Sequence, residues 1–136
     1  MEASKAHAFI QRLSKDTIEG KIKWERATKY AGLDIDSNPE IAFLFLNNEY
    51  RSVSYYESYE SMIQSGTLFL LDVSTFSGRD GSRIRALELY IYGAMDQLQE
   101  IQIEQPYLYQ LRNAIQSYMT QKESQIESFV DNYLET

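Results

Sequence analysis

The spacing of apolar residues predicts a helix near the start of the chain, over residues 4–19. Ser4 is a candidate N-cap, because its hydroxyl can accept a hydrogen bond from a free backbone N–H of the first turn. Gly20 follows where a residue in the left-handed conformation often ends a helix. The residues expected on the buried face recur every three or four positions, and they are Ala6, Phe9, Ile10, Leu13 and Thr17.

Alternation with a period of two predicts strands in the middle of the chain. Residues 21–26 alternate charged and apolar side chains, which indicates a half-buried strand with Ile22 and Trp24 directed inward. Residues 41–46 and 67–74 are apolar at successive positions, a pattern typical of an interior strand covered on both faces. The remaining strands are predicted over residues 51–58 and 83–92, and the second of these separates Leu87, Leu89 and Ile91 from Tyr90 and Tyr92.

Short polar segments predict turns between these strands. Asn47-Asn48 precedes residues 51–58, and asparagine tolerates a positive φ better than most residues. Asp80-Gly81 lies between residues 67–74 and 83–92, and this dipeptide is a frequent hairpin turn. Four or five strands joined in this way predict an antiparallel meander.

A second helix is predicted over residues 106–135, with Pro106 as a favourable first residue. A heptad-like apolar stripe follows it, interrupted only by Lys122. Ser124 and Glu127 also match a capping box, so the sequence leaves open whether this segment is one helix or two, with residues 121–136 as a helical extension. The stripe consists of Leu108, Leu111, Ile115, Tyr118, Ile126, Phe129 and Tyr133.

These elements predict a single α+β domain over residues 1–136. An N-terminal helix is followed by an antiparallel meander of four to five strands and by a long or broken C-terminal helix packed on the sheet. Both helices are expected to cover the same sheet face, because the interior strands are too apolar to be left bare.

Composition narrows the chemistry. The chain has no cysteine and one histidine, which excludes a disulfide scaffold, a thiol nucleophile and a two-histidine zinc motif. Its net charge is −7, and residues 86–136 contain eight acidic but only two basic side chains. Such a charge argues against nucleic-acid binding, which needs clustered Lys and Arg. We find neither a membrane span nor a signal peptide, and a cytoplasmic location is expected.

For several motifs the sequence favours a structural role over a functional one. The segment Asp34–Asn38 resembles the start of a calcium loop, but Pro39 and Phe45 stand where the loop needs glycine and glutamate. His7 has no partner that the sequence can identify, and general acid–base catalysis needs one. Glu57 and Glu60 are close in sequence, but spacing along a chain does not show two carboxyls facing a sugar. We therefore predict no catalytic residue, metal ligand or cofactor.

The turn at residues 78–83 is the one local concentration of positive charge. Arg79, Arg83 and Arg85 surround two glycines whose backbone amides could hold a phosphate or carboxylate. The structural alternative, which we favour, is a hairpin tip whose arginines protect the strand ends.

Tyrosine is unusually frequent, with eleven residues, and it is enriched at protein interfaces. Tyr90 and Tyr92 lie on the sheet face away from Leu87 and Leu89, where they either meet a partner or lie under a helix. Together with the acidic C-terminal third they suggest a partner-binding surface, made of Tyr90, Tyr92, Glu100, Glu104 and Glu127.

The end of the second helix carries more apolar surface than a solvated segment needs. We expect it to pack on a second copy of the protein and to form a homodimer. The residues predicted to self-associate are Ile126, Phe129, Val130, Tyr133 and Leu134.

Two segments carry a resemblance to known sequences. Residues 9–24 read F-I-x-x-L-x-x-x-T-x-x-G-K-I-K-W, and residues 108–115 read L-x-x-L-x-x-A-I. Both resemble a loose group of small bacterial and phage proteins of unknown function with a helix–GKIxW–β-meander–helix layout. The resemblance implies an α+β fold and a mobile-element or accessory protein, and it adds no enzymatic residues.

The sequence thus predicts a small, acidic, soluble protein that is not an enzyme and that binds another protein as an adaptor or inhibitor. The alternative is a binder of a small anionic ligand, or a minor enzyme, that uses residues 79–85.

Overall fold

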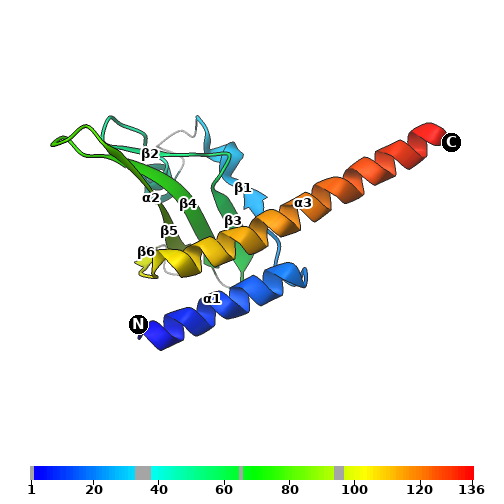
Figure 1. Cartoon of the computed structure of the whole chain (residues 1–136), viewed down its shortest axis with the longest axis horizontal. Helices are drawn as coiled ribbons and strands as arrows, with labels where there is room; N and C mark the ends of the chain where they lie inside the picture. Colours follow the sequence, from blue (N-terminus) through cyan, green and yellow to red (C-terminus); the bar gives the residue numbers. More distant parts are fainter. Residues whose placement is uncertain (1, 33–37, 65, 94–96) are drawn as a thin grey trace.

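The computed structural model describes residues 2–32, 38–64, 66–93 and 97–136 as an α+β structure (Figure 1). Five strands lie in the order β1-β3-β4-β5-β6, β2 pairs with the far half of β4, and every pairing is antiparallel. The elements in chain order are α1 (Ala3–Ile18), β1 (Glu25–Arg26), the 3₁₀ helix η1 (Ala27–Tyr30), α2 (Pro39–Leu44), β2 (Arg51–Val53), β3 (Tyr59–Ile63), β4 (Gly66–Phe76), β5 (Arg83–Tyr92), β6 (Leu98–Ile101) and α3 (Gln105–Glu135).

The central strand β4 is buried on both faces, as its apolar sequence predicts. Leu68 and Leu70 face the core beneath α1 and α3, whereas Phe69, Leu71 and Val73 face a second core on the other side. This split follows from the period of two in a strand, which sends successive side chains to opposite faces. The sheet is therefore the middle layer of the molecule.

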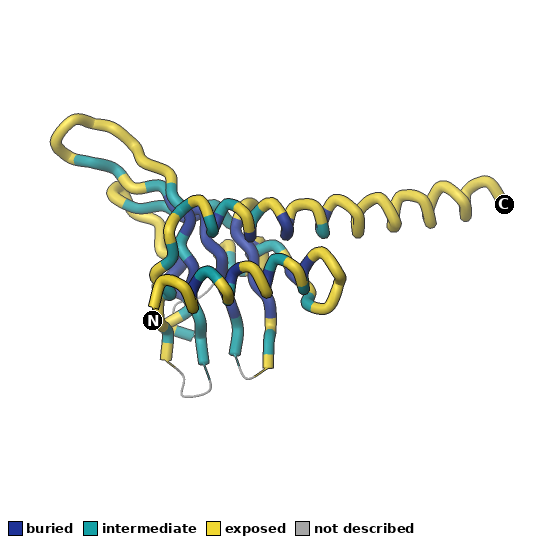
Figure 2. The backbone as a smooth tube through the Cα atoms, turned by 60° about the horizontal axis from the view of Figure 1, so that its bottom comes forward, coloured by how far each residue is buried: buried dark blue, intermediate teal, exposed yellow. Residues whose placement is uncertain are grey.

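The two long helices cover the same face of the sheet, which confirms the predicted arrangement (Figures 1 and 2). They run side by side in the same direction. Near their beginnings the ring of His7 stacks on that of Tyr107 with centroids 3.7 Å apart. Their contact surface is formed by Ile10 and Leu13 of α1 with Leu108, Leu111, Ile115 and Met119 of α3.

α1 and α3 differ from the sequence-based expectations in detail. Ser4 is not the N-cap of α1, because the helix begins at Ala3 after Glu2, which makes no side-chain cap bond. α3 is one continuous helix of 31 residues, so the capping box at Ser124 does not break it. At about 1.5 Å per residue α3 is about 46 Å long, far longer than α1.

The clearest error in the sequence analysis concerns residues 41–46, which form no strand. Pro39 to Leu44 make the short helix α2, and the Asn38 side chain caps it by accepting a hydrogen bond from the N–H of Ile41 (3.3 Å). Proline at the first turn of a helix loses no hydrogen bond, and asparagine is a favoured N-cap. A short run that is apolar at every position fits a strand or a helix equally well, so these two residues decide the structure.

The other differences concern strand lengths. The predicted strand over residues 21–26 shortens to β1, although Trp24 is buried as expected. Only Arg51–Val53 of the predicted strand over residues 51–58 pairs in the sheet. β3 and β6 were not predicted, whereas β5 has the predicted bounds and β4 extends beyond residues 67–74.

Candidate functional site

The C-terminal half of α3 projects from the rest of the molecule as a single helix (Figures 1 and 2). Every residue from Thr120 to Thr136 is exposed. The reason is that α1 ends at Ile18, and Gly20, with a φ of +73°, turns the chain back toward the sheet. We call residues 121–135 the tail.

The tail carries an apolar stripe that lies between 45% and 75% exposed. With 3.6 residues per turn, this stripe continues the face of α3 on which Leu111 and Ile115 are buried. The face that packs on α1 and the sheet in the first half of α3 is thus uncovered in the second half. The tail stripe consists of the five residues predicted to self-associate, Ile126, Phe129, Val130, Tyr133 and Leu134.

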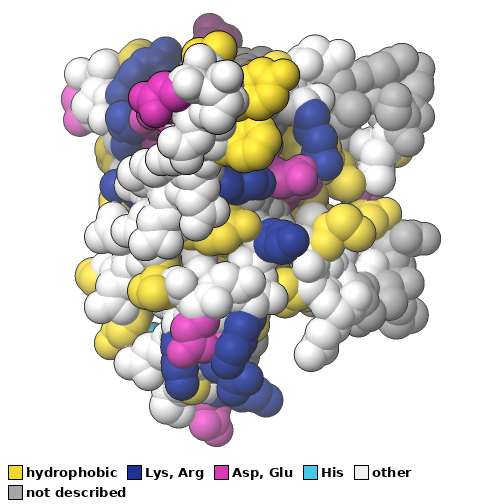
Figure 3. Space-filling model, turned by 90° about the vertical axis from the view of Figure 1, so that its right-hand side faces the viewer, with side chains coloured by type: hydrophobic (Ala, Val, Ile, Leu, Met, Phe, Trp, Pro, Cys, Tyr) yellow, Lys and Arg dark blue, Asp and Glu magenta, His cyan; other side chains and the backbone are white. Residues whose placement is uncertain are grey.

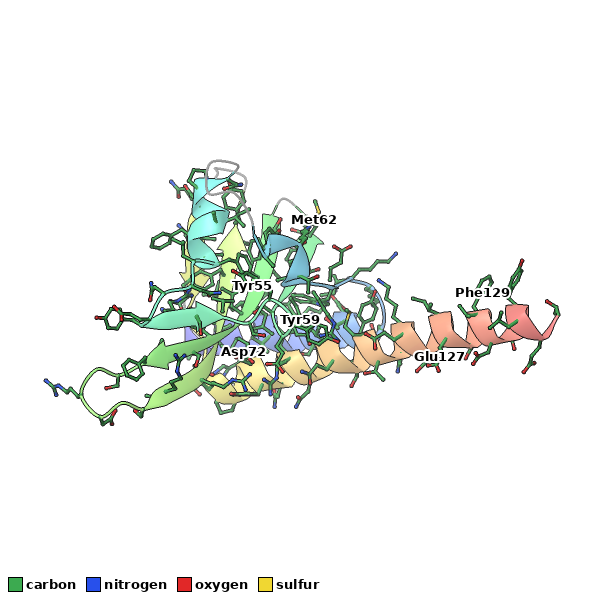
Figure 4. The ribbon with its side chains drawn as sticks, turned by 90° about the horizontal axis from the view of Figure 1, so that it is seen from above. Tyr55, Tyr59, Met62, Asp72, Glu127 and Phe129 are labelled. Atoms are coloured by element: carbon green, nitrogen blue, oxygen red, sulfur yellow. The ribbon has the colours of Figure 1, made fainter. Side chains whose placement is uncertain are left out.

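An acidic edge runs along the tail, beginning beside the stripe at Glu123 and passing to the opposite face of the helix at Asp131 and Glu135. Glu123, Glu127, Asp131 and Glu135 recur every four residues, so each lies close to the next along the helix. Figure 4 shows Glu127 and Phe129 on opposite sides of the tail. Glu123 lies 3.6 Å from the guanidinium of Arg26, while the other three have no ion-pair partner within the described part of the chain.

A hollow of about 320 Å³ lies at the root of the tail, where α1 ends beside α3. Its walls combine apolar, basic and amide side chains with one acidic residue, Glu19, which pairs with Lys21. Lys23 and Lys122 form no ion pair among the described residues. Figure 3, which looks along α3 from its C-terminal end, shows Lys and Arg side chains interspersed with Asp and Glu where α1 lies. The lining that matters below is Ile18, Gly20, Lys23, Tyr118 and Lys122.

This hollow was not predicted from the sequence. Ile18, Lys23 and Tyr118 come together only through the packing of α1 on α3, which no local pattern encodes. The one signal in the sequence is Lys122, the basic residue that interrupts the heptad-like stripe.

Tyr90 and Tyr92 belong to the second core of the sheet, on the α2 side. The Tyr90 hydroxyl donates a hydrogen bond to Glu88 Oε1 (2.7 Å), and burial together with this carboxylate raises the pKa of Tyr90. Glu100 lies opposite Tyr90 across the β5–β6 pair, and burial and Glu88 raise the pKa of Glu100. Tyr90 and Tyr92 are therefore half-buried in the second core, whereas Glu100 lies exposed beside them.

The two remaining acidic residues of the predicted partner surface lie elsewhere. Glu104 directly precedes α3, with Oε2 4.0 Å from Nε2 of His7. Glu127 lies on the tail, at the opposite end of α3 from β6 (Figure 1). The five predicted residues thus do not form one surface, and only Glu127 flanks the tail stripe.

The three arginines of the anion-binding alternative lie on the β4–β5 hairpin, and one of them is engaged. Arg85 Nη2 lies 2.7 Å from Asp72 and 2.6 Å from Glu57, and these carboxylates raise its pKa. Arg79 and Arg83 are exposed. The anion-binding hypothesis therefore rests on two exposed arginines, because the charge of Arg85 is already neutralised by two carboxylates.

The other carboxylates singled out in the sequence take part in separate structural contacts. Glu60 is buried and contacts the Tyr30 hydroxyl and the Lys29 ammonium, whereas Glu57 binds Arg85. Most of the calcium-like segment, residues 34–37, lies outside the described residues. In the part that is described, no three His, Cys, Asp or Glu residues are grouped to hold a metal, and no helix is long and apolar enough to span a membrane.

A second apolar area lies between α2 and β6. An open depression of about 480 Å³ is lined there by Pro39, Glu40, Phe43 and Leu98, and Phe43 is largely exposed. Phe43 is the one large apolar side chain of this lining that is exposed, whereas the tail stripe has five.

Comparison with models of protein families, with curated proteins and with solved structures gives no match to this chain. Its site is therefore interpreted from its own geometry.

Proposed function

We propose that this protein acts by binding another protein chain through the tail, as an adaptor or inhibitor and not as an enzyme. The supporting observation is the tail stripe, five large apolar side chains that all lie exposed on one helix. Burying a side chain of this size is worth roughly 1.5–3 kcal/mol. Contiguous exposed apolar patches of this kind mark interaction sites.

The shape of the tail favours docking of another helix or into a groove. A single amphipathic helix presents its side chains at i, i+3, i+4 and i+7, which is the spacing of Ile126, Phe129, Val130 and Tyr133. The acidic edge, which begins beside the stripe, would select a partner with basic residues at the rim, because rim charges contribute mainly to specificity and association rate.

The test compares the protein captured by the wild-type chain and by a tail variant. Phe129→Gln/Tyr133→Gln removes two aromatic side chains without changing the net charge or the helix propensity greatly. The matched control is Met62→Gln/Ile84→Gln, which removes two side chains that are 84% and 61% exposed outside the tail. Each tagged chain is cross-linked in a lysate of the cells that make it.

We expect the wild-type chain and the control variant to retain the same partner in a fixed molar ratio. A second copy of the chain counts as such a partner. The tail variant should lose it. Retention of the same protein by the tail variant, or no retention by any of the three chains, would overturn the proposed function.

A further inference from the structure

The uncovered face of the tail has a definite geometry. It is continuous with the face of α3 that α1 covers, so a partner helix would lie in line with α1, beyond the end of that helix. Packed helices lie about 8–10 Å apart, which is the space that α1 fills beside the first half of α3. The missing element is therefore a helix about as long as the tail itself.

A second tail fits this space in one direction only. If two tails ran parallel, the first halves of the two α3 helices would also have to lie side by side. The face they would use for this contact is already covered by α1. If they run antiparallel, each tail passes beyond the end of the partner's α1 and stops near the hollow. The length agrees, because the fifteen residues of the tail span about 22 Å.

The heptad positions define the register of such a pair. In an antiparallel pair, residues of the apolar seam face one another when their numbers add to a constant. A sum of 255 keeps the heptad positions of the two tails in common layers, with Val130 opposite Gln125 and Leu134 opposite Gln121. Ile126 then faces the partner's Phe129, and Tyr133 faces the partner's Lys122. Tyr133 and Leu134 at the tip reach the partner's hollow beside Ile18 and Tyr118. The basic interruption in the stripe thus meets an aromatic ring, a favourable contact for an ammonium group.

The buried area is of the right order. An aromatic side chain contributes roughly 150–250 Å² when it is fully buried, and each tail offers two of them with three aliphatic side chains. With the hollow this approaches the roughly 800 Å² per partner of a standard interface.

We infer that two copies of this chain form an antiparallel pair through their tails, each tip seated in the partner's hollow. This inference rests on the proposed function and names the occupant of its docking surface. A second copy is supported as the occupant by the continuity of the stripe with the α1–α3 contact and by the area that two tails would bury.

Sedimentation equilibrium tests the pairing with the full chain and the two double variants described above. We expect the wild-type chain and Met62→Gln/Ile84→Gln to dimerise with the same dissociation constant. Phe129→Gln/Tyr133→Gln should raise it at least about 30-fold, the loss typical of removing a central aromatic contact. Circular dichroism confirms that the variants fold. A wild-type chain that is monomeric at 100 micromolar overturns the inference.

Disulfide trapping tests the antiparallel direction of the two tails. The chain has no native cysteine, so only the introduced cysteines can form a disulfide. Lys122→Cys and Tyr133→Cys are prepared as separate proteins, mixed and oxidised. In the antiparallel register these positions face each other, while each lies about 16 Å from its own counterpart. The mixture should therefore give the mixed disulfide, and either protein alone should stay unlinked. Homodisulfides as the main product would overturn the antiparallel register.

The two sets of experiments separate the inference from the proposed function. A monomeric chain whose tail still captures a different protein contradicts the inference and leaves the proposed function standing. A chain whose tail binds neither a second copy nor another protein contradicts both.

Discussion

At the scale of single residues, the contact between Thr17 and Trp24 ties α1 to the sheet. Both side chains are fully buried. The Thr17 hydroxyl donates to the Leu13 carbonyl (2.7 Å) and accepts a hydrogen bond from Trp24 Nε1 (2.9 Å). One hydroxyl therefore satisfies the only polar atom of the largest side chain in the core.

Thr17→Val should lower the free energy of unfolding by about 1–3 kcal/mol. Valine keeps the shape of the side chain but leaves the indole N–H of Trp24 buried and unpaired. The expected loss of stability is the desolvation free energy of that unpaired N–H. Urea unfolding followed by fluorescence measures it directly, because Trp24 is the only tryptophan. Thr28→Val, at an exposed position, is the control and should change little. Equal stability of the two variants would show that water or another group satisfies the indole.

Glu100 gives a prediction for the pH dependence of stability. Burial and the nearby Glu88 raise its pKa above the ordinary value of 4.5, so the folded chain holds this proton at a higher pH than the unfolded chain does. The folded state binds more protons in that window, and its stability therefore falls as the pH rises from about 4.5 through the folded-state pKa.

Glu100→Gln should accordingly stabilise the protein at pH 7, and the gain over the wild-type chain should shrink toward pH 4. Thermal unfolding between pH 4 and pH 8 measures both parts. Glu49→Gln, at an exposed position with no ion pair among the described residues, serves as the control. A gain that is the same at every pH would contradict the role of the Glu100 charge.

At the scale of elements, long periodic segments were predictable and short ones were not. The helix predicted over residues 4–19 and the strand over residues 83–92 match α1 and β5, because many residues share one period. Residues 41–46 did not, because six apolar residues fit either period and Asn38 and Pro39 decide the matter. β3 and β6 were not predicted because they form by pairing with β4 and β5, and the local pattern of apolar residues does not indicate this pairing.

The candidate site was predictable to the same degree. The five residues of the tail stripe follow from heptad spacing, and the structure shows them exposed on one helix. The acidic and aromatic residues predicted around Tyr90 do not form one surface with Glu127, since charge counts along a chain do not give positions in space. The hollow at the tail root depends on two helices meeting and is visible only in the structure.

At the scale of the whole molecule, the tail is structurally separate from the layers that form the two hydrophobic cores. The sheet, α1 and the first half of α3 enclose both cores, and no residue of the tail belongs to either. Within the described residues, the tail is linked to the sheet by the ion pair of Arg26 with the exposed Glu123, a type of contact worth at most about 1 kcal/mol. The tail should therefore contribute to stability through pairing and hardly at all within its own chain.

This separation predicts how the thermal midpoint depends on concentration. Pairing stabilises the folded state by mass action, so the midpoint of the full chain should rise as its concentration is raised from 1 to 100 micromolar. A chain ending at Thr120 should melt at one temperature throughout, and the full chain should approach that temperature on dilution. Differential scanning calorimetry at three concentrations measures this. If the shortened chain melts lower by the same margin at every concentration, the tail stabilises its own domain, and the division between core and docking helix is wrong.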